Sequence, residues 1–237
     1  MPARGLHGEA YRGHVFWDEL FVLPYVTMQF PEVVARSLLM YRHRRLRAAR
    51  ASPRRSGSRG AMFPWQSGSA GTEQTQTRHL NPRSGRWLPD HSYLQRHVGS
   101  AIAWNVWRYG QSTGDTAFVE GPGAELLLEI ALYWGSVTTF DADRERYRIL
   151  GVVGPDEYHD AYPDVPGLGI DDNAYTNVTA AWTIARAREL IDAPPAARRG
   201  ELVEQLGIEN GWLIGCRARR PPGALGSRAP RGRSRAG

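Results

Sequence analysis

The stretch "GPDEYHD", residues 154–160, places two acids, a tyrosine, a histidine and a third acid behind a Gly-Pro corner. A carboxylic acid that donates a proton near neutral pH needs a raised pKa, which partial burial and neighbouring carboxylates both provide. Asp156 and Asp160 supply that like charge on the two sides of Glu157. The loop therefore indicates a general acid, and Glu157 is the candidate.

Two other interpretations of this loop stay open. It is either an ordinary solvated acidic loop or a metal site built from Asp156, Glu157, His159 and Asp160. Adjacent residues of one loop rarely converge on an ion without further ligands, and the chain has no paired-histidine motif. We therefore expect no metal site.

A second segment, "GHVFWDE" (13–19), sets Trp17 beside Asp18 with His14 close by. An indole face covers the axial hydrogens of a sugar, and a carboxylate accepts hydrogen bonds from the hydroxyls at its rim. The alternative is a buried tryptophan followed by an aspartate that caps a helix. Spacing alone favours this alternative.

Two loops add candidate sugar contacts. "MFPWQSGSAGTE" (62–73) carries Trp65 and Glu73, although single exposed aromatics are common. "DDNAYTN" carries polar side chains at an expected helix start, Asn173 among them, which can bond to hydroxyls. For Thr176 or Asn177, helix capping is the better explanation.

Composition limits the class of protein. The chain has 237 residues, of which 41% are hydrophobic, as expected of one sizeable globular domain. The single cysteine, Cys216, excludes an internal disulfide framework, and we find neither a signal peptide nor an apolar run that spans a membrane. We therefore expect a cytoplasmic protein.

The net charge of +6 comes from arginine, because the chain contains no lysine. The arginines cluster in 42–59 and 216–237, which indicates a solvated helix end and a disordered tail. A nucleic-acid binder remains a rival, although no binding motif accompanies the charge. No phosphate loop of the G-x-x-x-x-G-K type and no G-x-S-x-G elbow occurs, which argues against common nucleotide-binding and esterase classes.

The elements that must position these loops are mainly helices. Apolar spacing and capping residues predict helices over 18–30, from Pro31 to a point before Pro53, over 91–110, after Asp115, from Pro122, from about 176, and over 197–208. A long functional loop is expected over 60–90, and only "YRILGVV" is typical of a strand. Helices joined by functional loops suggest an α/α toroid or another helical bundle.

Four blocks in this order, "GEAYRGHVFWDE", "GAMFPWQSGSAGTE", "LQRHVGSAIAWNVWRY" and "GVVGPDEYHD…DDNAYTN", resemble glycoside hydrolase family 65 over roughly residues 5–208. The resemblance implies an all-α fold with a partial (α/α)6 barrel in 1–211. The composition of 212–237 indicates a disordered tail, which is consistent with a frameshift. It makes Glu157 the general acid and assigns Trp17 and Asp18 to the non-reducing glucose. Trp65 and Glu73 would line the sugar cleft.

Two positions depart from the family pattern. Asp172 stands where asparagine is usual, and F-W-D-E is one residue shorter than F-W-D-T-E. We also expect the N-terminal β-sandwich and the second half of the barrel to be missing. That half carries the phosphate site of phosphorylases and the base of hydrolases.

The activity that this resemblance implies is inverting phosphorolysis of a disaccharide of maltose, trehalose or kojibiose type. The products would be β-glucose 1-phosphate and a free sugar, with inorganic phosphate as co-substrate, no cofactor and, in the family, a homodimer as a frequent assembly. An inverting hydrolase of trehalose type and an inactive truncated fragment are the alternatives.

Overall fold

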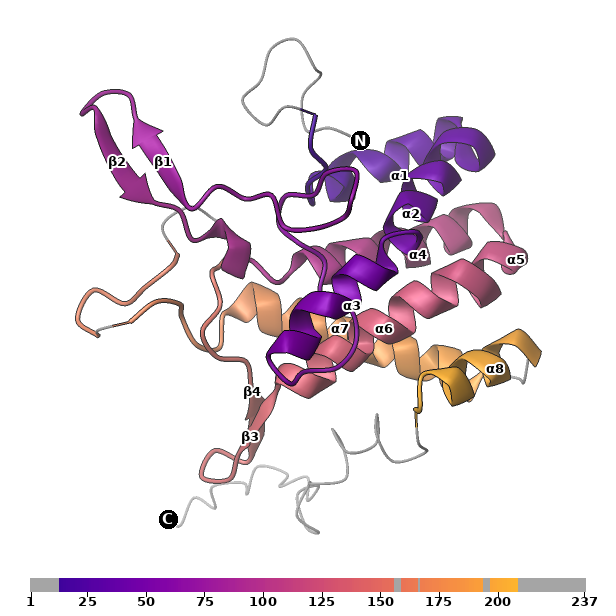
Figure 1. Cartoon of the computed structure of the whole chain (residues 1–237). Coiled ribbons are helices and arrows are strands. Elements are labelled where there is room, and N and C mark those ends of the chain that lie inside the picture. The colour runs from indigo at the N-terminus through magenta and orange to yellow at the C-terminus, as the bar shows by residue number, and fades with distance from the viewer. Residues whose placement is uncertain (1–12, 156–158, 166, 194–196, 209–237) are drawn as a thin grey trace, which may run out of the picture.

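The computed structural model describes residues 13–155, 159–165, 167–193 and 197–208, and these are mostly helical (Figure 1). The helices are α1 (Glu19–Gln29), α2 (Arg36–His43), α3 (Leu46–Arg55), α4 (Val98–Thr113), α5 (Thr116–Phe118), α6 (Ala124–Val137), α7 (Ala174–Asp192) and α8 (Ala197–Gln205). Shorter helical turns are η1 (Pro31–Ala35), η2 (Ser92–Leu94) and η3 (Val119–Gly123). The expected helical segments are therefore present, with shifted ends.

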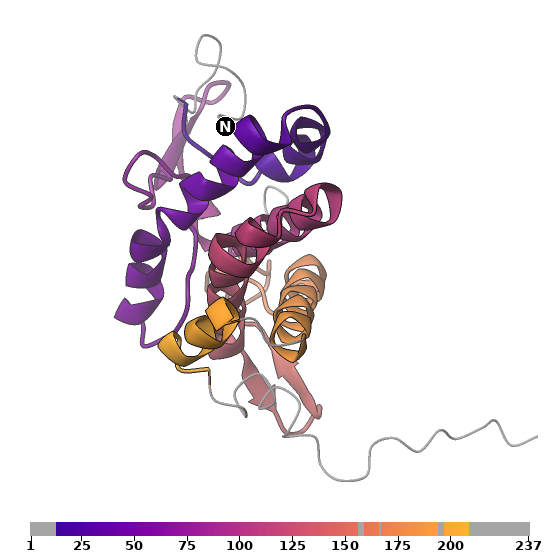
Figure 2. The ribbon, with the colours of Figure 1, turned by 90° about the vertical axis from the view of Figure 1, so that its right-hand side faces the viewer.

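Helices α4 and α6 form the centre of the described chain. Helix α4 packs against α1 and α7, and α6 packs against α4 and α7. Figure 2 shows α1, α4 and α7 stacked in this order. The β1–β2 hairpin and the loop that precedes α7 extend from the same side of these helices (Figure 1).

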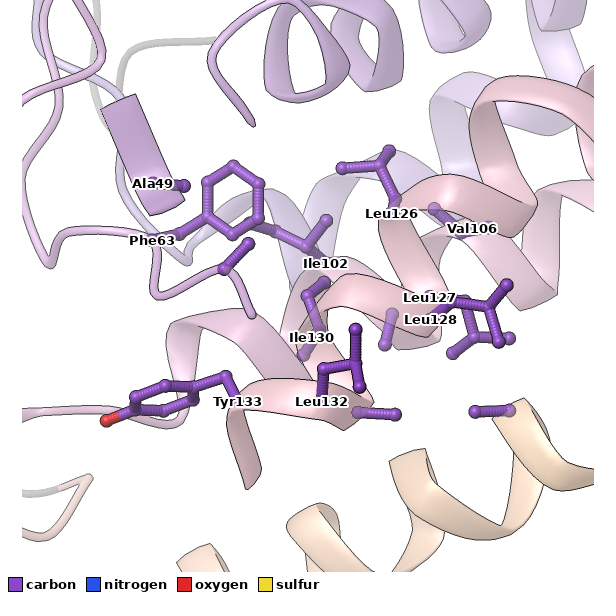
Figure 3. Packing of buried hydrophobic residues seen from close by; sticks show 14 of the residues in the cluster. Ala49, Phe63, Ile102, Val106, Leu126, Leu127, Leu128, Ile130, Leu132 and Tyr133 are labelled. Carbon is purple, nitrogen blue, oxygen red and sulfur yellow. The ribbon is translucent and has the colours of Figure 1, made fainter. Parts of the chain in front are cut away.

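The core lies around α6, whose sequence is apolar on nearly every face and is therefore buried on nearly every face. Figure 3 shows side chains from α3, the following loop, α4 and α6 meeting there. The labelled members are Ala49, Phe63, Ile102, Val106, Leu126, Leu127, Leu128, Ile130, Leu132 and Tyr133. This packing fixes the helix ends from which the candidate loops start.

Two antiparallel hairpins interrupt the helices. One pairs β1 (Arg78–Asn81) with β2 (Arg86–Pro89), and the other pairs β3 (Thr139–Asp141) with β4 (Arg146–Arg148). The first lies inside the segment expected to be a long loop. The expected strand "YRILGVV" contributes only its first two residues to β4, so both hairpins correct the sequence-based prediction.

The arginine stretch 42–59 also differs from the expectation of one helix with a solvated end. The helix is interrupted at Arg44–Arg45, between α2 and α3, and α3 continues through Pro53. Arg42 is fully buried, at 1% exposure, and Arg50 bonds to Glu125 and Glu129 of α6. Part of this positive charge therefore holds helices together.

The mainly helical architecture is confirmed, whereas a closed or partial barrel stays a proposal. The tail 212–237 lies outside the described residues. None of the helices that the structure describes is both long and apolar enough to cross a membrane.

Candidate functional site

Four aromatic rings from distant parts of the chain gather where the loops meet. Trp17 precedes α1, Trp65 lies in the loop after α3, His97 precedes α4, and Tyr175 lies in the first turn of α7. The Trp17 and His97 ring centroids are 4.5 Å apart, and His97 lies 5.6 Å from Tyr175 and 6.0 Å from Trp65. The structure thus brings together the two tryptophans predicted to contact a sugar, and it places His97 close to both of them and to Tyr175.

The two tryptophans are half-buried rather than enclosed in the core. Trp17 and Trp65 pack against the core cluster on one side and remain partly accessible. Their ring centroids are 6.1 Å apart with planes tilted by 42°. An aromatic surface of this kind can cover the apolar face of a ring-shaped polar ligand.

Asp18 occupies the position of an N-cap, but its side chain makes no capping hydrogen bond to α1. The interpretation of Asp18 as an ordinary helix cap is therefore wrong. Its half-buried carboxylate directly follows the half-buried indole of Trp17. This pairing supplies an acceptor beside an aromatic face.

His97 is a site residue that the sequence did not single out. It is fully buried, and neither ring nitrogen has a hydrogen-bond partner among the described residues. Burial lowers the pKa of His97 to about 4, so that the ring is neutral at physiological pH. A histidine at the start of an apolar helix is unremarkable in sequence, and only the contacts with Trp17, Trp65 and Tyr175 reveal it.

This buried histidine predicts a pH dependence of stability. Unfolding returns His97 to a pKa near 6.5, so the unfolded chain takes up a proton that the folded chain refuses between pH 6.5 and 4. This difference does not change the free energy of unfolding above pH 6.5. As the pH drops below 6.5, His97 lowers the free energy of unfolding, by about 2 kcal/mol at pH 4.5. Urea unfolding at pH 7 and 4.5 should show this loss in the wild type and not in His97→Asn. An equal loss in wild type and variant would contradict the prediction; His79→Gln, on the exposed hairpin, is the control.

Glu73 organises the loop that holds Trp65. Its carboxylate accepts hydrogen bonds from the backbone N–H groups of Trp65 (3.1 Å), Gln66 (3.2 Å) and Thr75 (3.2 Å), and from the Thr75 hydroxyl. The contact of Glu73 with a sugar stays a prediction, because these bonds account for the carboxylate in this structure.

His14 lies beside a separate polar pocket of about 440 Å³. Its Nδ1 is 2.5 Å from Nε2 of Gln66, and the pocket is also lined by Tyr41, Ser67 and Gln74. Val15 pairs with Ser67 and thereby links the segment of Trp17 to the loop of Trp65. A contact of His14 with a sugar stays a prediction.

Asn173 caps α7, since its Oδ1 accepts from the backbone N–H (3.0 Å) and the hydroxyl (3.1 Å) of Thr176. The expectation that Thr176 or Asn177 is the cap was therefore wrong. A Cβ on Gly154 would lie 3.1 Å from Nδ2 of Asn173, which places this amide against the acidic loop. The contact of Asn173 with a sugar stays a prediction.

The unusual Asp172 is matched by an arginine. Its Oδ2 accepts from Nε of Arg148 at 2.7 Å. Burial raises the pKa of Asp172, but the hydrogen bond and the positive charge of Arg148 outweigh this effect, so that the pKa is lowered. Asp172 adopts a positive φ of 54°, which aspartate and asparagine tolerate better than most residues. The extra negative charge is thus paired at the base of the acidic loop.

Glu157 itself lies outside the described residues, and only the stems of its loop can be placed. Gly154 N donates to His159 O (3.0 Å), and Val152 pairs with Ile170. Val153 N donates to Leu94 O (3.2 Å), three residues before His97. The loop stem is therefore tied to the segment that leads into the aromatic cluster.

The described part of the chain contains no group of three or more His, Cys, Asp or Glu side chains arranged to hold a metal ion. Two members of the metal alternative, Asp156 and Glu157, lie outside that part. Among the described residues, the arrangement provides aromatic faces, a carboxylate that makes no capping bond and a neutral histidine. Such a set can bind a neutral polyhydroxylated ligand.

Comparison with known proteins gives a consistent result. Residues 1–212 match the model of the glycosyl hydrolase family 65 central catalytic domain. An uncharacterized glycosyl hydrolase of Mycobacterium tuberculosis is 57% identical over 208 residues, covering 88% of this chain and 16% of that protein. A trehalose 6-phosphate phosphorylase of Lactococcus lactis is 50% identical over 190 residues, covering 80% of this chain and 24% of that protein.

A kojibiose phosphorylase of Caldanaerobacter subterraneus is 40% identical over 195 residues, covering 81% of this chain and 24% of that protein. Among solved structures, a putative kojibiose phosphorylase from the human microbiome superposes with a TM-score of 0.76 at 25% identity. The match covers 93% of this chain and 27% of that one. The chain thus spans about a quarter or less of the length of these relatives.

Proposed function

Because the chain belongs to glycoside hydrolase family 65, we propose that it carries the glucose-binding wall and the general acid of an inverting disaccharide phosphorylase. The substrate is an α-glucosidic disaccharide of maltose, trehalose or kojibiose type, and phosphate is the second substrate. The observation that carries the proposal is the pairing of the Trp17 indole with the carboxylate of Asp18, which makes no capping bond to α1, next to Trp65. The relatives named as phosphorylases of trehalose 6-phosphate and of kojibiose support the reaction class.

The proposed roles follow from the chemistry of each side chain. The indoles of Trp17 and Trp65 cover the apolar face of the non-reducing glucose, and Asp18 accepts hydrogen bonds from its hydroxyls. Glu73 and Asn173 contact the sugar from the edge of this site, while Glu73 also organises the loop of Trp65 and Asn173 also caps α7. His14 reaches the sugar from the neighbouring polar pocket. The neutral ring of His97 lies buried beneath the two indoles, at the bottom of the proposed glucose site.

Glu157 protonates the glycosidic oxygen while the bond between this oxygen and the anomeric carbon breaks. Phosphate attacks that carbon from the opposite face, which gives β-glucose 1-phosphate and a free sugar. An inverting hydrolase needs a second carboxylate to activate water, whereas phosphate is already a competent nucleophile. One acid therefore suffices for phosphorolysis.

The rival activity is hydrolysis of trehalose, and the dependence on phosphate separates the two. We expect cleavage of trehalose, kojibiose or maltose to require phosphate and to yield glucose and glucose 1-phosphate in equal amounts; with trehalose 6-phosphate the second product is glucose 6-phosphate instead of glucose. The assay is run on this chain and on the Lactococcus lactis relative as a positive control. Cleavage at the same rate without phosphate would contradict phosphorolysis, and a folded chain that binds an α-glucoside without turning it over would identify a binding-competent but inactive fragment.

A further inference from the structure

The turn that carries Trp17 and Asp18 is bracketed by one buried ion pair. Phe16 lies just before the turn and Glu19 just after it, as the first residue of α1. Arg42 of α2 reaches both, because Nη2 donates to Phe16 O (2.9 Å) and to Glu19 Oε2 (2.9 Å), and Nε donates to the same carboxylate at 3.1 Å. One guanidinium thus contacts the backbone before the turn and the side chain of the first residue after it.

Burial makes this pair unusual for the chain. The side chains of Arg42 and Glu19 are only 2% and 6% exposed. An ion pair so deeply buried adds little net stability, because the cost of removing both charges from water offsets their attraction. A guanidinium does, however, present its donors in a rigid planar fork and so fixes direction.

In the F-W-D-E block, Glu19 of the ion pair lies directly beside Asp18. Glu19 follows Asp18 without an intervening residue, so its carboxylate is held one residue from the acceptor that we assign to glucose. Rotation of the Phe16–Glu19 turn would move the Trp17 ring, which lies 4.5 Å from His97. The contacts of Arg42 oppose that rotation.

We propose that Arg42 and Glu19 are positioning residues of the glucose site, which hold the Trp17–Asp18 turn so that indole and carboxylate face the same ligand. This inference rests on the proposed function for the identity of the ligand, but not for the geometry of the turn. A merely structural pair would stabilise the chain without orienting Trp17.

The test separates orientation from stability by replacing the pair with apolar side chains. Arg42→Met combined with Glu19→Leu removes both charges of this pair together, and such replacements are often neutral or stabilising. Arg42→Lys keeps the charge opposite Glu19 but loses the fork. Glu129→Gln is the matched control, because it breaks another ion pair of low exposure, Arg50–Glu129 (2.8 Å), between α3 and α6.

The readout is the indole N–H signal of Trp17 in two-dimensional ¹H–¹⁵N spectra of the whole chain. The chain has eight tryptophans, and Trp17→Phe identifies the signal by its loss. We expect the apolar pair and Arg42→Lys to shift or broaden this signal, and Glu129→Gln to leave it in place. Affinity for methyl α-glucoside, titrated in the same spectra, should fall at least tenfold in the first two variants.

The outcomes distinguish the two proposals. A displaced Trp17 signal in the variants supports the positioning of the Trp17–Asp18 turn by Arg42 and Glu19, which we call the clamp. This holds even when the wild type shows no shift with methyl α-glucoside, a result that would count against the sugar site alone. An unmoved Trp17 signal with unchanged affinity in the folded Arg42→Lys or apolar-pair variant overturns the clamp and leaves the sugar site standing. Displacement of the signal in Glu129→Gln as well would overturn the clamp too, because any loss of an ion pair would then suffice.

Discussion

Replacement of Glu157 by glutamine is expected to lower the rate of disaccharide phosphorolysis by about 10²- to 10⁴-fold, the usual contribution of a general acid. Glutamine keeps the size of the side chain but has no acidic proton for the departing oxygen. Substrate affinity should change little. The measurement is the formation of glucose 1-phosphate, in this chain and, with the aligned glutamate replaced, in the Lactococcus lactis relative.

A substrate with a good leaving group provides the control for this prediction. α-Glucosyl fluoride releases fluoride without protonation, so the Glu157→Gln variant should use it at close to the wild-type rate. Asp164→Asn removes an exposed carboxylate from the same loop and should have no effect. Near-normal turnover of a natural disaccharide by Glu157→Gln would exclude Glu157 as the acid.

Replacement of Asp18 by asparagine is expected to weaken binding of methyl α-glucoside about 100-fold, because hydrogen bonds from hydroxyls to a carboxylate are the stronger kind. Trp17→Ala, which removes the aromatic face, should abolish measurable binding. Calorimetric titration of this chain gives both affinities. Melting temperatures should stay within a few degrees for Asp18→Asn, since its side chain makes no capping bond to α1.

Matched substitutions outside the site guard against general effects. Trp87→Ala removes an exposed indole from β2, and Asp143→Asn neutralises an exposed carboxylate in the β3–β4 turn. Both should bind methyl α-glucoside as the wild type does. Equal affinity in Asp18→Asn and Asp143→Asn would remove Asp18 from the site.

The sequence predicted the helical fold well because the helices carry their own signals. The apolar faces of α4 and α6 repeat with helical spacing, and Asp115 caps α5 as expected, accepting from Phe118 N at 3.0 Å. The β1–β2 hairpin was missed because its strands, "RHLN" and "RWLP", are largely exposed and lack alternating apolar residues. Pairing between them, not burial, gives this hairpin its form.

The candidate site was predictable only in part. Trp17 and Trp65 were found because an aromatic ring next to a carboxylate, or on a polar loop, has a chemical meaning in one dimension. His97 and Arg42 were not, because their roles come from contacts across the fold: His97 meets rings from three other segments, and Arg42 meets Glu19, 23 positions earlier. An arginine-rich stretch does not reveal which arginine is buried.

A crystal structure of the Glu157→Gln chain with a bound α-glucosidic disaccharide would show whether residue 157 and the Trp17–Asp18 pair meet the same sugar. We expect the non-reducing glucose to lie against the indoles of Trp17 and Trp65 with its hydroxyls on Asp18, and the side chain at 157 to lie within hydrogen-bonding distance of the glycosidic oxygen. A disaccharide bound elsewhere, or a residue 157 directed into solvent away from the sugar, would contradict this expectation.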